Sequence, residues 1–174
     1  LKSIASAPGK IILFGEHFVV HGTKAILAAI NKRVTVTTTI TEKQTLKINS
    51  QLGTFEIPMW KGEGELLSQI GIYESMLGMA YETRKSNFLA DKIKSEFRPF
   101  VYLVASLTRI DMEHKLALTK SWEALGLEIT IDSDIPVGVG LGSSSACCVA
   151  AAASLSAIFR TAIGKRLEYL IKSH

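Results

Sequence analysis

The chain has 174 residues, of which 47% are apolar and 21% are charged, so it is long enough for one globular domain with a substantial core. Its net charge of +4 is mild and includes no lysine or arginine block, which argues against nucleic-acid binding and favours small anionic substrates. We expect no membrane-spanning stretch and no signal peptide, because no segment shows the required length or pattern. Cys147 and Cys148 are neighbours that cannot readily bridge each other, so a reducing, cytosolic setting is expected.

The N-terminal segment combines apolar runs with polar residues at their ends. Pro8-Gly9 predicts a turn, and Ile11–Phe14 predicts a short buried strand. Glu16 and His17 follow that strand directly, at a place where sites are often found, although each residue alone is more often an exposed surface group. His17 and His21 have i, i+4 spacing, but the segment between them looks β-rich and offers no third ligand. A zinc site is therefore not expected.

Three further segments predict strands. Val34–Ile40 is β-branched and alternating, which is the strongest strand pattern in the chain. Thr45–Ser50 and Thr54–Ile57 flank a glycine and continue the pattern. The early part of the chain therefore predicts a mostly antiparallel sheet.

The middle of the chain changes to helical spacing before a last strand, Leu127–Ile131. The order of elements predicts a single α+β domain. The expected helices cover residues 62–80, Phe88–Phe97, and a segment from Pro99 to about Met112.

The last strand leads into Pro136–Ala146, with the sequence PVGVGLGSSSA. Its glycines stand at alternate positions, where the backbone can adopt positive φ and let a ligand approach. The serines begin an Ala-rich segment that predicts a helix, and a helix N-terminus offers unpaired N–H groups and partial positive charge to a phosphate. Serine hydroxyls are also suitable oxygen ligands for Mg²⁺. The stretch therefore predicts a nucleotide phosphate loop.

Other glycine motifs fit this loop less well. No lysine follows Gly142, as a Walker A loop requires, and the G-x-G-x-G spacing is not that of a dinucleotide fingerprint. A glycine-rich turn before a packed alanine helix is the plain structural alternative. The serine triplet favours the anion site over that alternative.

The two ends of the chain together resemble a known family. Ser6–Gly22 (SAPGKIILFGEHFVVHG) resembles the first signature of the mevalonate kinase family, and Pro136–Ala146 resembles the phosphate-loop signature of the GHMP kinase superfamily. Gly15-Glu16-His17 followed by Val19–Gly22 favours mevalonate kinases over galactokinases and phosphomevalonate kinases. The resemblance spans the whole chain but only the N-terminal half of such an enzyme.

The resemblance implies the family's left-handed βαβ unit, ATP and mevalonate as substrates, Mg²⁺ as cofactor, and a cytoplasmic, homodimeric full-length enzyme. Lys10 matches the lysine near the transferred phosphoryl group, so it is implied in catalysis and in both substrate sites. Glu16 and His17 match residues lining the mevalonate site, Ser133 matches a serine contacting ATP, and Ser144 matches the catalytic serine that binds Mg²⁺. The residues implied around the ATP phosphates are Gly138, Val139, Gly140, Leu141, Gly142, Ser143 and Ser144.

Some positions depart from the family pattern. Ser145 replaces the usual alanine after the serine pair, and Val137 replaces the second proline of a common Pro-Pro. The family's catalytic aspartate and a second metal-ligating glutamate would lie beyond His174. We therefore expect residues 1–174 to be an incomplete N-terminal domain with little activity alone. Another GHMP small-molecule kinase and a non-catalytic nucleotide-binding fragment both remain open.

Overall fold

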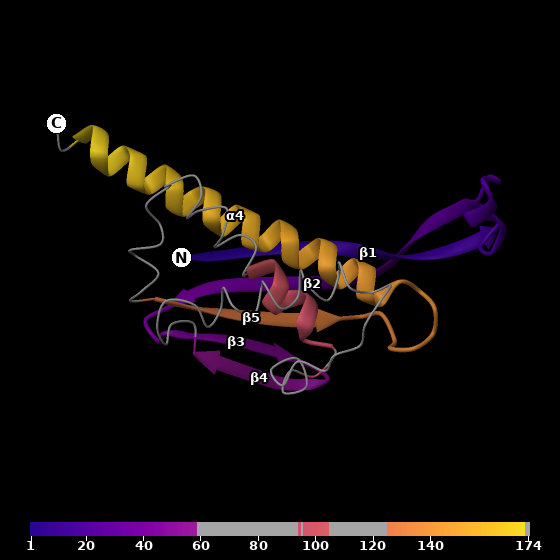
Figure 1. The fold of residues 1–174 in the computed structure, drawn as a ribbon, viewed down its shortest axis with the longest axis horizontal. Coiled ribbons are helices and arrows are strands. Elements are labelled where there is room, and N and C mark those ends of the chain that lie inside the picture. The colour runs from indigo at the N-terminus through magenta and orange to yellow at the C-terminus, as the bar shows by residue number, and fades with distance from the viewer. Residues whose placement is uncertain (59–93, 95, 105–124, 173–174) are drawn as a thin grey trace, which may run out of the picture.

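The computed structural model describes residues 1–58, 94, 96–104 and 125–172, with side chains for all of them except Val19 and residues 161–172. One five-stranded sheet and a long helix dominate the described part (Figure 1). The elements are β1 (Lys2–Phe14), the 3₁₀ helix η1 (Phe18–His21), β2 (Ile26–Thr41), β3 (Thr45–Ser50), β4 (Gly53–Pro58), β5 (Gly126–Ser133) and α4 (Ser143–Lys172), with a short helix at residues 98–104.

The sheet has the strand order β1-β2-β5-β3-β4. All neighbouring strands are antiparallel except β3 and β5, which run parallel. The predicted α+β class and the mostly antiparallel sheet are therefore confirmed. The handedness of the βαβ unit stays a prediction.

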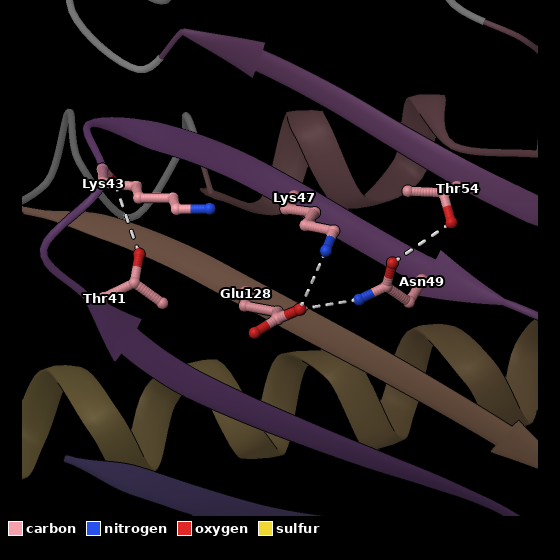
Figure 2. Close-up of polar contacts among 6 residues, drawn as sticks. All are labelled: Thr41, Lys43, Lys47, Asn49, Thr54 and Glu128. Carbon is pink, nitrogen blue, oxygen red and sulfur yellow. Dashed lines mark hydrogen bonds and ion pairs between the residues drawn. The ribbon is translucent and has the colours of Figure 1, made fainter.

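The short helix at residues 98–104 and α4 cover the same face of the sheet, and the core lies between them and the strands (Figures 1 and 2). Alternation along the strands explains why: every second residue of β2, from Val34 through Val36 to Thr38, is buried, whereas the residues between them are only half-buried. The core joins aliphatic strand residues to both helices. Its fully buried large side chains include Leu46, Ile48, Leu127, Ile129, Phe97, Val104, Leu155 and Ile158.

One buried polar contact fixes α4 on the sheet. Ser154 and Thr38 are both fully buried, and their hydroxyl oxygens are 2.9 Å apart in a hydrogen bond. The Ser154 hydroxyl also lies 3.2 Å from the carbonyl oxygen of Ser3 on β1. Because an unpartnered hydroxyl would be costly at this depth, the contact sets the position of the helix over β1 and β2.

The opposite face of the sheet is polar (Figure 2). Asn49 donates a hydrogen bond to the carboxylate of Glu128 at 2.8 Å, and Lys47 forms an ion pair with the same oxygen at 3.4 Å. The Thr54 hydroxyl donates to Asn49 at 3.2 Å, which extends this network onto β4. Since the ion-paired side chains are more than a third exposed, the network contributes more to strand register than to stability.

The predicted strands are confirmed, and all but Thr45–Ser50 are longer than predicted. The expectation that Ile11–Phe14 is a buried strand is wrong, because these residues end the long β1 and Leu13 and Phe14 are 52% and 71% exposed. Val34–Ile40 lies inside a β2 of 16 residues, and Leu127–Ile131 lies inside β5. The predicted turn at Pro8-Gly9 is wrong, because β1 continues through it for 13 residues with a register shift at this point. A β-bulge accommodates proline and glycine without ending a strand.

Three further expectations change. The segment between His17 and His21 is a 3₁₀ helix rather than β-rich. The helix expected from Pro99 begins one residue earlier, at position 98. Phe97, expected as the end of another helix, lies in a turn. The rest of these helices, the helix expected at 62–80 and the side chains of the expected C-terminal apolar face lie outside the described residues.

The expectation that no stretch has the length of a membrane span is wrong. In α4 the 18-residue window Ser143–Arg160 has a mean hydropathy of 1.3, which suffices by length and composition alone. In this structure 39% of the window is buried, and α4 packs against β1 and β2. A helix that covers a sheet needs the same apolar composition.

Candidate functional site

The glycines of the phosphate loop adopt the backbone that the sequence predicts. Gly138, Gly140 and Gly142 have φ values of 80°, 74° and 74°, in the left-handed region that favours glycine. A Cβ atom at Gly138 or Gly140 would meet no atom within 4 Å, so the first part of the loop borders open space. Alternating left-handed residues turn successive N–H groups toward one side, which is the geometry of an anion-binding nest.

The loop ends on the N-terminus of α4. The first intrahelical hydrogen bond runs from the Ala146 N–H to the Gly142 carbonyl at 3.0 Å, so Gly142 occupies the cap position. The helix begins at Ser143 as predicted, but the serines form its first turn rather than its cap. Their N–H groups precede the helical ladder, and Ser144 and Ser145 are exposed. Backbone donors and hydroxyls are therefore available together at the positive end of a 30-residue helix.

β1 holds the loop from one side. The Lys10 N–H donates a hydrogen bond to the Leu141 carbonyl at 2.9 Å. The preceding residue, Gly9, allows this approach, because a Cβ there would lie 2.9 Å from both the Leu141 oxygen and Ile135 Cδ1. The glycine of the first signature and the end of the loop, at Leu141 and Gly142, thus belong to one packed junction.

The Lys10 side chain extends along the end of the loop. A Cβ at Gly142 would lie 2.9 Å from Lys10 Cγ and 3.4 Å from Cε, so the lysine stem runs over this glycine. The stem is half-buried and the ammonium group lies at its far end. The structure therefore brings Lys10 and the N-terminus of α4 together, across more than 130 residues of sequence.

Ser133 holds the entrance to the loop. Its hydroxyl bonds both the N–H and the carbonyl of Ile135 at 3.1 Å, and its carbonyl accepts a 3.1 Å hydrogen bond from Gln51. The hydroxyl thus stabilises a local turn, and an ATP contact by Ser133 stays a prediction. Asp132 and Asp134 on either side are exposed.

A cavity of about 230 Å³ opens beside the first two turns of α4. One wall carries Ser143 and Ser144, so the cavity adjoins the proposed phosphate site. Most of the remaining wall is apolar and comes from β2, β5, the β3–β4 turn, the phosphate loop and the short helix with the turn before it. It includes Val34, Ile131, Phe97, Pro99, Phe100 and Val137. A flat apolar group attached to a phosphate chain fits this arrangement.

The sequence did not predict this cavity. Phe97 and Phe100 come from a segment with ordinary helical spacing, and Phe97 also stacks on Phe55 of β4 with ring centroids 5.6 Å apart. Such aromatic residues are normally read as core, and most of each ring is indeed buried. No sequence pattern separates a core aromatic from one whose edge forms a cavity wall.

Glu16 and His17 lie at a different place. The β1–β2 hairpin extends beyond the part of the sheet that α4 covers, and η1 forms its tip, apart from the phosphate loop (Figure 1). Both side chains are exposed, and within the described residues neither lines the cavity. The hairpin also exposes large apolar side chains, namely Leu13, Phe14, Phe18, Val20, Ile26 and Leu27.

The comparisons with known proteins support one family. Residues 103–172 match the family model for the GHMP kinases N terminal domain. The chain is 33% identical over 184 residues to the mevalonate kinase of Thermococcus gammatolerans, 34% over 166 residues to that of Pyrococcus furiosus and 36% over 164 residues to that of Dictyostelium discoideum. These alignments include 99%, 95% and 91% of this chain. They include only 46%, 42% and 38% of the relatives, so the chain spans less than half of their length.

Solved structures agree on the fold. The chain is similar to the crystal structure of the Methanococcus jannaschii mevalonate kinase, with a TM-score of 0.54 and 22% identity over 91% of this chain and 41% of the other. A second mevalonate kinase structure gives a TM-score of 0.58 and 23% identity over 90% and 40%. These likenesses confirm the fold, and the sequence similarity to the mevalonate kinases agrees with the resemblance that the two signatures suggested.

Proposed function

We propose that this chain, which has the N-terminal domain of the GHMP kinases, binds ATP and supplies the nucleotide-binding part of a mevalonate kinase. The proposed reaction is transfer of the γ-phosphoryl group of ATP to the 5-hydroxyl of mevalonate. One observation carries the proposal: Lys10 and the N-terminus of α4 meet at a loop whose three glycines hold positive φ. Phosphoryl transfer depends mainly on positioning and charge stabilisation, and this junction supplies both.

The phosphate chain of ATP would lie over the loop. Donors for its oxygens are the N–H groups of the loop and of Ser143 to Ser145, which precede the helical ladder. Lys10 adds a full positive charge at the end of the loop. The cavity beside Ser143 and Ser144 would take the nucleoside, because its wall is mostly apolar and its volume is of the order of a nucleobase and sugar.

The residues present fit a magnesium ion that arrives with the nucleotide. Within the described residues no group of three or more His, Cys, Asp or Glu side chains could form a protein-only metal site. Mg²⁺ does not require one, since it usually takes one or two protein oxygens together with phosphate oxygens. The exposed Ser144 hydroxyl is the proposed protein ligand. The ion would neutralise phosphate charge when bound.

Mevalonate is proposed as the acceptor because the relatives carry that name and because Glu16 and His17 match residues of the family's substrate site. These two side chains would contact mevalonate from the hairpin tip. We further propose a cytoplasmic, homodimeric full-length enzyme in which a C-terminal domain supplies the base. Residues 1–174 alone are then expected to bind nucleotide weakly and to phosphorylate no mevalonate.

The deciding test uses the full-length protein and its Ser144→Ala variant in a coupled assay of mevalonate-dependent ADP release, at saturating and limiting Mg²⁺. We expect activity in the wild type and a loss in the variant that is largest at limiting Mg²⁺. Folding should change little, because Ser144 is exposed and is not the cap residue, and such surface substitutions change stability by about 0.5 kcal/mol or less. Wild-type turnover of Ser144→Ala at limiting Mg²⁺ would refute the metal role.

Substrate profiling separates the alternatives in the same assay. If the protein preferred galactose, phosphomevalonate or another hydroxyl substrate, the proposed nucleotide site would stand, but the proposal of mevalonate as the acceptor would be wrong. Nucleotide binding without phosphorylation of any acceptor by the full-length protein would favour a non-catalytic nucleotide-binding protein.

A further inference from the structure

Two adjacent thiols line the proposed nucleotide cavity. Cys147 and Cys148 lie in the second turn of α4, just beyond the phosphate-binding serines, and both contribute to the cavity wall. Both are free cysteines of intermediate exposure. The helix itself does not require cysteine here, because alanine fills most of its neighbouring positions and is the better helix former.

The two thiols differ in their surroundings. Cys147 packs against the hydrophobic core. Burial, together with the neighbouring Cys148 charge, raises the pKa of Cys147 to about 11. At pH 8 only about one Cys147 in a thousand is then a thiolate, so this residue is a poor nucleophile. Cys148 is not among the side chains packed on the core, and it too borders the cavity.

We propose that Cys148 is a site of reversible thiolation by disulfides that approach from the open side of the cavity, and that the adduct excludes nucleotide. The Cys148 thiolate attacks one sulfur of the disulfide, the S–S bond of the reagent breaks, and a mixed disulfide forms on Cys148. The other half leaves as a thiolate and takes up a proton from water. A free thiol reverses the reaction by the same exchange. The protein thereby gains a redox-sensitive block of its nucleotide site.

The geometry explains why the block would be complete. A cavity of about 230 Å³ cannot hold both a tripeptide-sized adduct and a nucleoside. The adduct would also stand next to Ser144, one helical turn away on α4, where the nucleotide phosphates would begin. The second part of the proposal, exclusion of nucleotide, rests on the proposed ATP site, whereas the thiolation itself does not.

The test treats the full-length protein with glutathione disulfide at pH 8 and locates the adduct by peptide mass mapping. Within residues 1–174 we expect one adduct, on Cys148, that dithiothreitol removes. Cys148→Ser should lower the rate of adduct formation by on the order of tenfold or more, and the matched control Cys147→Ser should leave it within about twofold. Protein unfolded in urea should react at both positions. A native adduct mainly on Cys147, or none on either residue, would overturn the proposal.

The position of the adduct is mapped on the wild-type protein. The proposal can therefore be refuted even if the Cys148→Ser variant does not fold. A second arm adds Mg-ATP to the reaction and measures nucleotide binding by the thiolated protein. Slower thiolation with ATP, and ATP binding lost on thiolation and restored by dithiothreitol, are expected. Thiolation of Cys148 without any effect of ATP would overturn the blocking role and count against the proposed nucleotide site. ATP binding to a protein whose Cys148 does not react would overturn only the thiol site.

Discussion

The two signature regions of this chain, the phosphate loop and the hairpin tip, differ in how many contacts they make with the rest of the fold. The end of the phosphate loop is fixed by its own fold, through the Lys10–Leu141 hydrogen bond, the contact of Lys10 with Gly142 and the buried start of α4 at Ala146. The first part of the loop, residues 136–140, is exposed. The hairpin tip around η1 carries Glu16 and His17 but exposes its large side chains, such as Phe14 at 71% and Val20 at 78%.

The difference indicates that the phosphate-binding groups are already in place, whereas the groups at the hairpin tip need another surface to complete their site. Donors that bind phosphate act best when they are already in place, and the loop meets that condition within residues of this chain. The tip places polar residues beside exposed apolar ones, a composition typical of surfaces that bind something else. The phosphate half of the proposed site is thus built locally, whereas the acceptor half is not.

The largest effect is expected from Lys10→Met in the full-length kinase. The variant keeps the backbone hydrogen bond to Leu141 and most of the stem over Gly142 but removes the charge. A lost contact to developing phosphate charge costs on the order of 10²- to 10³-fold in kcat. KM for mevalonate should change much less, because the contact is stronger in the transition state.

Lys32→Met is the matched control, since Lys32 is exposed on β2 and has no place in the proposed site. Its kcat should stay near that of the wild type. If the two variants lost turnover equally, Lys10 would be an ordinary surface lysine. The phosphate loop would then not be the preorganised part of the proposed active site.

The sequence predicts much of the loop because the relevant physics is local. Alternate glycines before serines dictate positive φ and a helix terminus, and the structure shows both. The close approach of Gly9 to Leu141 is different, since it joins residues more than 130 positions apart and no periodicity reports it. The resemblance placed Lys10 near the phosphates, but its stem contact with Gly142 came only from the structure.

The errors have physical causes as well. Pro8-Gly9 reads as a turn in isolation, yet pairing of β1 with β2 on both sides of it turns the irregularity into a bulge. The tip reads as strand because Phe18 and Val20 have β propensity, and a single 3₁₀ turn fits between two long strands instead. In both cases tertiary pairing outweighed local preference.

A pair of glycine substitutions measures how tightly the loop is held. Gly140 and Gly142 share a φ of 74°, so alanine at either position carries the same left-handed strain of about 1–2 kcal/mol. Only Gly142→Ala adds a Cβ at 2.9 Å from Lys10 Cγ, which must move. We expect this variant to lose about 1–3 kcal/mol more in urea unfolding and to bind nucleotide more weakly. Equal losses for both would mean that Lys10 does not lie on the loop.

The anchoring of α4 is tested by Ser154→Ala. The change leaves the buried Thr38 hydroxyl without its partner, at a cost of about 1–3 kcal/mol in the free energy of unfolding. Ser156 lies on the same helix but is exposed, so Ser156→Ala should stay within about 0.5 kcal/mol of the wild type. A neutral Ser154→Ala would show that apolar packing alone positions the helix, and hence its phosphate-binding end.

The smallest effect is expected at the hairpin tip, where Phe14→Ser replaces a large apolar side chain that is 71% exposed. A side chain that contacts so little of the fold contributes little to it, so the free energy of unfolding should change by less than about 0.5 kcal/mol. Phe97→Ser is the matched core variant: that ring is 2% exposed and stacked on Phe55, and its loss should cost at least about 3 kcal/mol. Urea unfolding of residues 1–174, followed by far-UV circular dichroism, measures both. A loss of more than about 1 kcal/mol for Phe14→Ser would mean that the tip is packed within this chain. The contrast between a self-contained loop and an open tip would then be wrong.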